Sequence, residues 1–201
     1  MIDNIELIKP LLNFENSDDF YMLYIFKRKK DQENPENSQS VRTIKSYCIN
    51  SIESLEYKYE EIKQLSEIFK ARVYIHIQKQ NHYEIGLNMI IELGNRLKNK
   101  VYNQKNLFES VVGQLKVLEK RWIIDLDFKD EFHINTHIKC INNDCEPIGE
   151  KVITIIPTKQ GVHLITKPFN TETYRNLISY NNSDIQKKNP TLLYYPNSLE
   201  K

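Results

Sequence analysis

The segment that most constrains the fold is the run 121–128, in which apolar and other side chains alternate. Because successive side chains of a strand point to opposite faces, the even-numbered residues of this run share one apolar face. The opposite face carries Asp125 and Asp127 beside Ile123. Two neighbouring carboxylates repel each other, and burial disfavours their charged forms. A divalent cation removes that cost, and Mg²⁺ and Mn²⁺ prefer carboxylate oxygen; a solvated surface strand is the alternative interpretation.

Size and composition limit the class of protein. A chain of 201 residues suits one domain or two small subdomains that share a core. Because the net charge is only +1, any surface that binds nucleic acid must be local. Three cysteines, an odd number, argue against a disulfide framework. The start of the chain lacks the pattern of a signal peptide, and no stretch has the length of a membrane span, so we expect a cytoplasmic protein without a membrane partner.

The first half, residues 1–120, is expected to form a mixed α/β subdomain. Apolar residues on both faces of Phe20–Phe26 indicate a buried strand, and Val41–Ile49 follows it across a polar loop at 31–40. Ser51 is the expected N-cap of a helix with apolar residues at helical spacing from Ile52 to Phe69. A strand at 71–78 and helices at 83–97 and 106–120 complete this half. The residues expected to face the core from these two helices include Ile85, Ile90, Ile91, Leu97 and Leu118.

The second half, residues 121–201, has the order strand, hairpin, helix, strand. Strands at 151–156 and 162–166 flank a tight turn, in which Gly161 suits a position with positive φ. Asn170 or Thr171 is expected to cap the helix, and Thr191–Tyr195 forms the last strand. The pattern predicts a mostly antiparallel sheet that resembles an RNA-recognition motif, with a polar insert without helical period at 129–150. The fold class expected for the whole chain is therefore α+β.

Polar residues in and beside the hairpin are candidates for binding phosphate. Thr158 and Lys159 lie in the turn, and His163 follows on the second strand, on the face that it shares with Ile165. A hydroxyl, an ammonium group, turn amides and an imidazole can together hold phosphate oxygens. A structural role for the histidine is the alternative. Asp184, before the last strand, is either a turn residue or a third carboxylate beside the aspartate pair.

The ordered motifs resemble those of the archaeo-eukaryotic primase superfamily of primase-polymerases. The first motif, an apolar strand that carries D-x-D, is matched by residues 123–127, and the second, small-x-His, by residues 161–163. The third, an apolar residue followed by Asp, is matched less well, since Ser183 precedes Asp184. The resemblance in element order covers residues 20–196, and its motifs cover residues 121–195.

The resemblance implies a two-part core that joins nucleoside triphosphates on a single-stranded DNA template. Asp125, Asp127 and Asp184 would hold Mg²⁺ or Mn²⁺, and His163 would contact the triphosphate. No Gly-x-x-x-x-Gly-Lys-Ser/Thr loop occurs in the sequence, so a separate helicase or replication protein is the expected partner. A small primase of this kind fits the replication of a phage, a plasmid or another mobile element.

The insert at 129–150 contains a second group of metal-ligating residue types. Their spacing is His-x3-His-x2-Cys-x4-Cys, from His133 and His137 to Cys140 and Cys145. Two imidazoles and two thiolates suit a tetrahedral structural Zn²⁺ site, which would order a polar insert. A polar loop whose cysteines stay free is the alternative.

A basic run follows the first strand and is a candidate for contact with the template backbone. It comprises Lys27, Arg28, Lys29 and Lys30. Two other functions fit the same residues. One is a metal-dependent nuclease or nickase on a related sheet, and the other is a nucleic-acid-binding module without catalytic activity.

Overall fold

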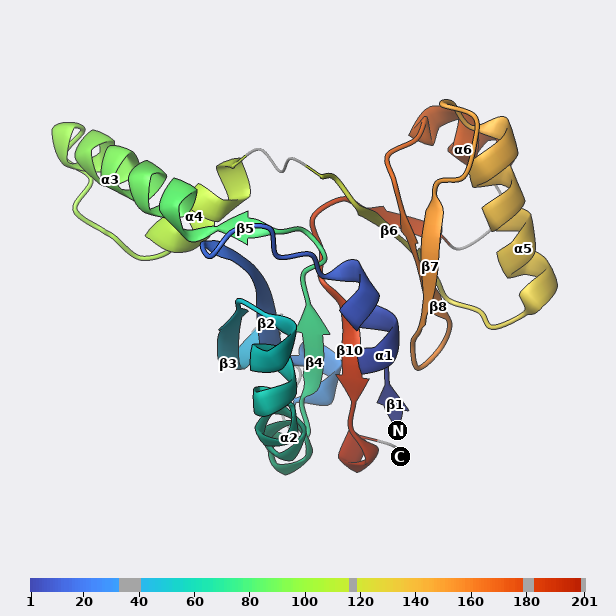
Figure 1. The fold of residues 1–201 in the computed structure, drawn as a ribbon, viewed down its shortest axis with the longest axis horizontal. Helices are drawn as coiled ribbons and strands as arrows, with labels where there is room; N and C mark the ends of the chain where they lie inside the picture. Colours follow the sequence, from blue (N-terminus) through green and yellow to red (C-terminus); the bar gives the residue numbers. More distant parts are fainter. Residues whose placement is uncertain (33–40, 116–118, 179–182, 200–201) are drawn as a thin grey trace.

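The computed structural model describes residues 1–32, 41–115, 119–178 and 183–199, which form two antiparallel sheets with helices around them (Figure 1). The larger sheet has the order β1 (Ile2–Asp3), β10 (Thr191–Tyr195), β4 (Arg72–Ile75), β2 (Asp19–Arg28) and β3 (Val41–Ile49), with β5 (Gln80–Asn81) paired to β2. The smaller sheet has the order β7 (Val152–Pro157), β8 (Val162–Thr166), β6 (Trp122–Leu126) and β9 (Ser183–Gln186). The α+β class is confirmed. The polar loop expected at 31–40 lies mostly outside the described residues, as does Leu118.

One face of the larger sheet is covered by α2 (Ile52–Phe69), and the other is covered only in part. The hydroxyl of Ser51 accepts a hydrogen bond from the Ser54 amide and caps the helix, as its sequence predicts. Odd-numbered residues of β2 pack beneath α2 with the first turns of the chain, α1 (Ile5–Ile8) and the 3₁₀ turn Lys9–Leu11. Even-numbered residues of β2 from Tyr24 onward are only partly covered. Strand β2 is therefore buried on one face from Asp19 to Ile25, and its second face borders the candidate site from Tyr24 onward.

The smaller sheet has its own core, beneath α5 (Glu131–Lys139), a π-helical turn at Cys140–Asp144 and α6 (Thr171–Leu177). Ile124 and Leu126 of β6 point into it, whereas Ile123 packs in the core beneath α2. The alternation expected for this strand is therefore correct. The expectation that residues 129–150 lack helical structure is wrong. The buried apolar side chains of this stretch face the core of the smaller sheet, whereas Phe132 and Ile148 are exposed. The buried ones are Ile134, Cys140, Ile141 and Cys145.

The last strand belongs to the larger sheet, although sequence order suggests the second subdomain. Strand β10 pairs antiparallel with both β1 and β4, and all its residues are buried. Its place beside β6 is taken by β9, in a segment that the sequence suggests is a turn. The boundary expected at residue 120 thus separates the two sheets except at β10. A strand with apolar residues on both faces fits an interior position of the larger sheet.

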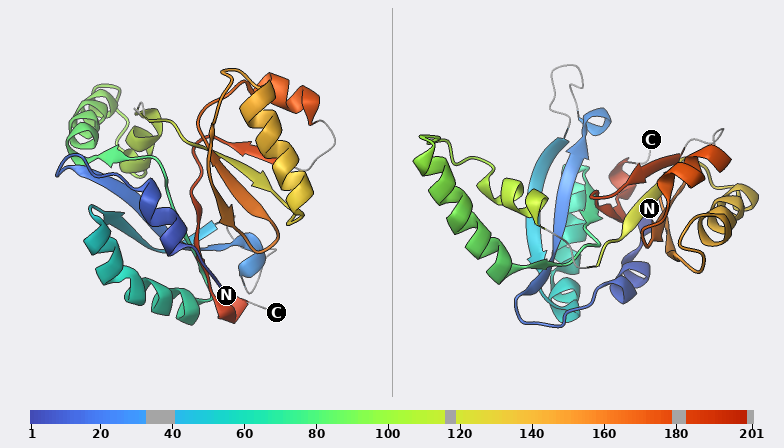
Figure 2. Two further views of the ribbon diagram at one scale, coloured as in Figure 1. Left: turned by 45° about the vertical axis from the view of Figure 1, so that its right-hand side comes forward. Right: turned by 90° about the horizontal axis from the view of Figure 1, so that it is seen from above.

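Helices α3 (His82–Lys98) and α4 (Leu107–Gln114) project from the side of the larger sheet (Figures 1 and 2). Ile85, in the first turn of α3, is buried as expected. Ile90, Ile91 and Leu97 are 70%, 61% and 52% exposed, so their expected place in the core is wrong. The spacing correctly gives an apolar face, but α3 runs away from the sheet, and α4 covers only part of it.

Candidate functional site

The register of the smaller sheet brings together three of the residues singled out by their motifs. Strand β6 lies between β8 and β9, and Asp125 pairs with His163 on one side and with Asp184 on the other. The Oδ1 atom of Asp125 lies 3.5 Å from Nε2 of His163. Gln186, which the sequence does not single out, donates from Nε2 to Asp125 Oδ2 at 3.3 Å and to Asp184 Oδ2 at 3.0 Å. Gln186 lies two residues after Asp184 on one strand, so the two side chains share a face, and this spacing would have identified it.

The charge of Asp125 is only partly compensated. Burial raises the pKa of its carboxyl, and the nearby charges of Asp127 and Asp184 raise it further, against the effect of Arg28. Asp125 is half-buried, whereas Asp127 and Asp184 are exposed. Like charges near a desolvated carboxylate disfavour ionisation, and a cation placed there would favour it. The site thus has the electrostatic character of a cation-binding position.

His163 is buried, and its ring is held by a residue of the other sheet. Its pKa is lowered to about 4, chiefly by burial and also by the charge of Arg28, so the imidazole is neutral at pH 7. Nδ1 lies 2.9 Å from the hydroxyl oxygen of Thr191 on β10. If the hydroxyl donates to Nδ1, the proton of the neutral ring is on Nε2, which faces Asp125. The opposite tautomer would place two acceptors against each other. His163 therefore presents an N–H donor at the site.

The turn that carries Thr158 and Lys159 lies against the end of β6. The Thr158 amide donates to the Gly161 carbonyl, and the Gly161 amide donates to the Thr158 hydroxyl oxygen. A Cβ added to Gly161 would lie 1.7 Å from the carbonyl oxygen of Leu126. Gly161 is thus needed for close backbone contact. The expectation of a positive φ is wrong, because the positive-φ glycine in the described residues is Gly149.

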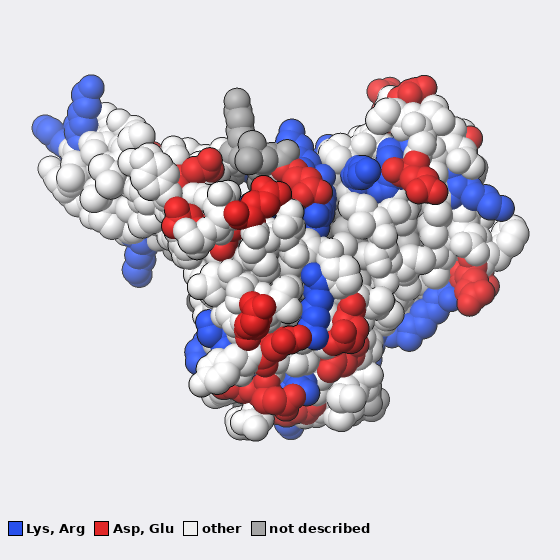
Figure 3. Space-filling view, viewed as in Figure 1, with Lys and Arg blue, Asp and Glu red and all other residues white. Residues whose placement is uncertain are grey.

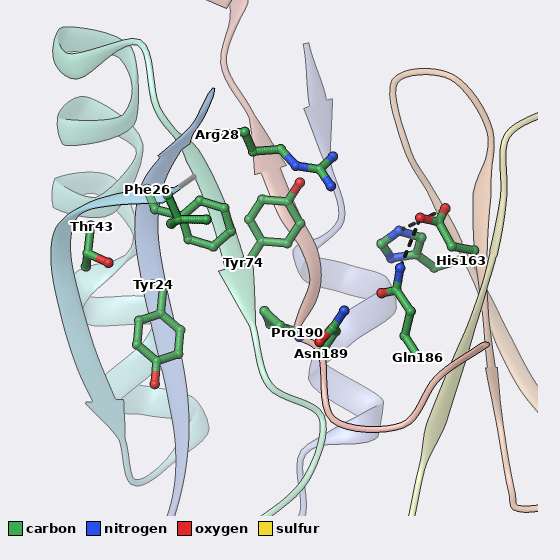
Figure 4. Close-up of a pocket in the computed structure, with 11 residues that line it drawn as sticks. Tyr24, Phe26, Arg28, Thr43, Tyr74, His163, Gln186, Asn189 and Pro190 are labelled. Carbon is green, nitrogen blue, oxygen red and sulfur yellow. Dashed lines mark hydrogen bonds and ion pairs between the residues drawn. The ribbon is translucent and has the colours of Figure 1, made fainter. Parts of the chain in front are cut away.

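A cavity of about 390 Å³ lies between the two sheets, on the open face of β2 (Figure 4). Its wall on the larger sheet is aromatic: Phe26 and Tyr74 stack with ring centroids 4.6 Å apart, and Tyr24 lies beside them. Asp125, His163 and Gln186 form the opposite wall, and Arg28 extends from the aromatic side toward His163. The sequence shows that aromatic residues alternate along β2, but it does not show that the face that carries them is open to a cavity.

A second hollow, rich in cations, adjoins the first. Both are lined by Arg28, Tyr74, Asp125 and His163. The second hollow adds Lys30, Arg72, Thr158 and Lys159, together with Asp127. The pKa of Lys30 is lowered, first by burial and then by the charges of Arg72 and Arg28, which shows that these cations are close together. Of the basic run 27–30, Arg28 and Lys30 thus line the site, whereas Lys27 and Lys29 are not among its lining residues.

The aspartates do not form a complete metal site by themselves. In the described part of the chain, no group of three His, Cys, Asp or Glu side chains is arranged to hold a metal ion. Mg²⁺ is commonly bound through one or two carboxylates, with substrate phosphates and waters as the other ligands. The carboxylates close to Asp125 fit such an incomplete set of protein ligands.

The four candidate zinc ligands do not converge. The thiols of Cys140 and Cys145 lie 4.0 Å apart in the core of the smaller sheet. His137 directs Nδ1 to the hydroxyl of Tyr174 at 2.6 Å, and the exposed His133 directs Nδ1 to Asp130 at 2.6 Å. A tetrahedral site needs four ligands directed at one point. Within the ranges that the structure describes, no three His, Cys, Asp or Glu side chains are grouped to hold a metal ion, and of these four candidates only the two thiols meet. The residues as they stand therefore do not form a structural zinc site.

Comparisons with known proteins do not place the chain in a family. No protein-family model matches it, and neither does any curated protein or solved structure. Among the described residues, no helix combines the length and apolar character that crossing a bilayer requires.

Proposed function

We propose that this protein is a primase-polymerase that transfers nucleotides to a growing strand on a single-stranded DNA template. The observation that carries the proposal is the position of Asp125 and His163 where an aromatic cavity meets a cation-lined hollow. A nucleoside triphosphate has the same two halves, a flat base and a polyanionic tail. The resemblance of the motifs to those of archaeo-eukaryotic primases supports the same activity.

Each part of the site has a role in this proposal. The base and sugar would occupy the cavity beside Phe26 and Tyr74, where aromatic faces favour stacking. The triphosphate would extend toward Lys159 and Arg28, with the Nε2–H of His163 as a further donor.

The proposed cofactor is Mg²⁺ or Mn²⁺. Asp125 would hold the ion together with Asp127 and Asp184, because the charges of these two carboxylates raise the pKa of the half-buried Asp125 and a cation would offset that effect. When bound, such an ion stabilises the charge of the transferring phosphoryl group and orients the attacking hydroxyl. We further propose that a separate helicase or replication protein is its partner. The pair would act in the replication of a phage, a plasmid or another mobile element.

Primer synthesis on a circular single-stranded template, with Mg²⁺ and Mn²⁺ compared, tests this function. The Asp125→Asn, Asp127→Asn double variant should lose at least about a hundredfold in nucleotide incorporation, since such charge-stabilising groups account for several kcal/mol of the barrier. Asp18→Asn is the matched control, because Asp18 is an exposed acid in the loop before β2. It should retain wild-type incorporation, and both variants should keep the wild-type circular dichroism spectrum.

Two outcomes would favour the other functions. Cleavage of a labelled single strand in the absence of nucleotides, abolished in the double variant, would indicate a metal-dependent nuclease. DNA binding without incorporation or cleavage, unchanged in the double variant, would indicate a binding module without catalytic activity. Full incorporation by the double variant would contradict the proposal.

A further inference from the structure

We infer that single-stranded nucleic acid lies along the open face of β2, with one unpaired base stacked on Tyr24 and His76 in a cavity beneath α4. This inference rests on the proposed function and deepens it, because it assigns the template a path separate from the nucleotide site. Of the basic run 27–30, where the template contacts were expected, Arg28 and Lys30 line the nucleotide site, and Arg28 also lies at the end of the proposed template path.

The open face of β2 carries a row of aromatic and apolar side chains. Phe20 and Met22 are covered by α3 and α4, but Tyr24 and Phe26 are only partly covered. On the next strand, Tyr74 stacks on Phe26, and the segment after that strand places His76 edge-on against Tyr24 at 5.6 Å. Flat side chains displayed in a row on a sheet face are the usual means by which proteins stack unpaired bases.

A cavity of about 210 Å³ lies next to the proposed nucleotide site, and Tyr24 lines both. Its other lining residues include Met22, His76 and Phe108, with Gln78 and Gln80. Pockets for drug-sized ligands usually exceed roughly 300 Å³, so this cavity suits one flat ring system. Apolar faces with a few amide groups match a nucleobase, which has a flat apolar face and a polar edge.

The wall between the two cavities is fixed by hydrogen bonds. The buried amide of Gln78 donates to the carbonyl of Lys187 at 2.7 Å and to that of Arg121 at 3.0 Å. Lys188 donates to the carbonyl of Gly113 in α4 at 2.6 Å and lines the cavity beneath α4. Asn189 and Pro190, the next residues, line the nucleotide cavity. Because one short segment forms a wall of both, their spacing is set by the fold, as a template base beside the incoming nucleotide requires.

The charges favour a polyanion on this face rather than on the opposite one. Arg28 lies at one end of the aromatic row and Lys188 at the other, with Glu109 as the acid that lines the cavity beneath α4. In Figure 3, acidic side chains gather over the region where α2 and the N-terminal segment lie. The acids of α2 are Glu53, Glu56, Glu60, Glu61 and Glu67. An apolar peptide would gain nothing from the flanking cations, whereas a single strand would use both stacking and charge.

The test measures binding of a fluorescein-labelled oligo(dT) of sixteen nucleotides by anisotropy, without nucleotides or divalent ions. The Tyr24→Leu, His76→Leu double variant should bind about tenfold more weakly or worse, as expected for the loss of base stacking. Tyr57→Leu is the matched control, because Tyr57 is 89% exposed on α2, on the opposite side of the sheet. It should bind as the wild type does. If the double variant does not fold, Phe108→Leu tests the same cavity from α4.

Other results would overturn the inference. Wild-type affinity in folded variants of the cavity beneath α4, equal affinity for a duplex of the same length, or no binding of the oligonucleotide would each contradict it. Binding of an apolar peptide that these variants abolish, without oligonucleotide binding, would identify the other class of occupant. The inference and the proposed function fail separately, because the Asp125→Asn, Asp127→Asn variant should bind the oligonucleotide normally even though it cannot extend a primer.

Discussion

The Nδ1 atom of His163, on the smaller sheet, lies 2.9 Å from the hydroxyl oxygen of Thr191, on the larger sheet. The residues are 28 positions apart, and both are buried. This contact joins the sheets at the site and fixes which ring nitrogen faces Asp125. The larger sheet thus helps to position a side chain that the smaller sheet carries.

Thr191→Val should therefore impair the proposed reaction, although the Thr191 side chain acts through His163 and does not itself contact the substrate. Loss of the hydroxyl leaves Nδ1 without its partner and lets the ring rotate or change tautomer, for which we expect a loss of about tenfold to a hundredfold in incorporation. The Michaelis constant for the nucleotide should rise as well, because His163 would no longer direct Nε2–H at the phosphates. Thr191→Ser keeps the hydroxyl and should restore most of the activity. Equal activity of the Val and Ser variants would contradict this role.

Gly161→Ala should strongly destabilise the fold. The added Cβ would overlap the backbone of β6 at Leu126, and two paired strands cannot move apart without losing hydrogen bonds. We expect the free energy of unfolding, measured in urea, to fall by more than about 3 kcal/mol. Gly94→Ala is the control, since nothing lies within 4 Å of the added atom in α3. That change should raise stability by roughly 0.5–1 kcal/mol; a similar effect at both glycines would refute the steric explanation.

Stability should fall as the pH is lowered from 6.5 toward 4, in part because of His76. Burial lowers the pKa of His76 to about 4, so in this range the unfolded chain takes up a proton that the folded chain excludes. The contribution to stability is complete above the unfolded pKa of about 6.5 and is lost toward the folded value, by about 2 kcal/mol at pH 5. His76→Gln should flatten the dependence measured by urea unfolding at pH 7.5 and pH 5. An unchanged slope would show that His76 titrates alike in both states.

The zinc content of the purified protein should be well below one equivalent per chain. The thiols of Cys140 and Cys145 are buried together, and in the portion of the chain that the structure describes no third His, Cys, Asp or Glu side chain joins them in a group that could hold a metal ion. We expect Cys140→Ala to lower the melting temperature by the loss of packing, equally with and without a chelator. Elemental analysis of the purified protein gives the direct measurement. One zinc per chain, with a melting temperature that falls on chelation, would contradict this expectation.

Local sequence patterns predicted those helices and strands whose formation depends mainly on residues close together in the chain. Alternation from 121 to 128 gives the faces of β6, since a strand has a period of two wherever it pairs. The bounds of β3 and the cap of α2 at Ser51 were also predictable, because both follow from residues within one or two turns. Helix α5 was missed because its nine residues include only three apolar ones, and one of these, Phe132, is exposed, which gives too weak a period.

The sequence by itself determined that Asp125 projects from the opposite face to Leu126, that His163 follows a tight hairpin, and that β2 alternates aromatic side chains. Only the tertiary structure decided that Asp184 lies in a strand beside Asp125, that β10 returns to the larger sheet with Thr191, and that Tyr24 faces a cavity. Side-chain direction along a strand is a local property of the backbone. The choice of partner strand depends on which distant surfaces are buried together, and no short segment contains that information.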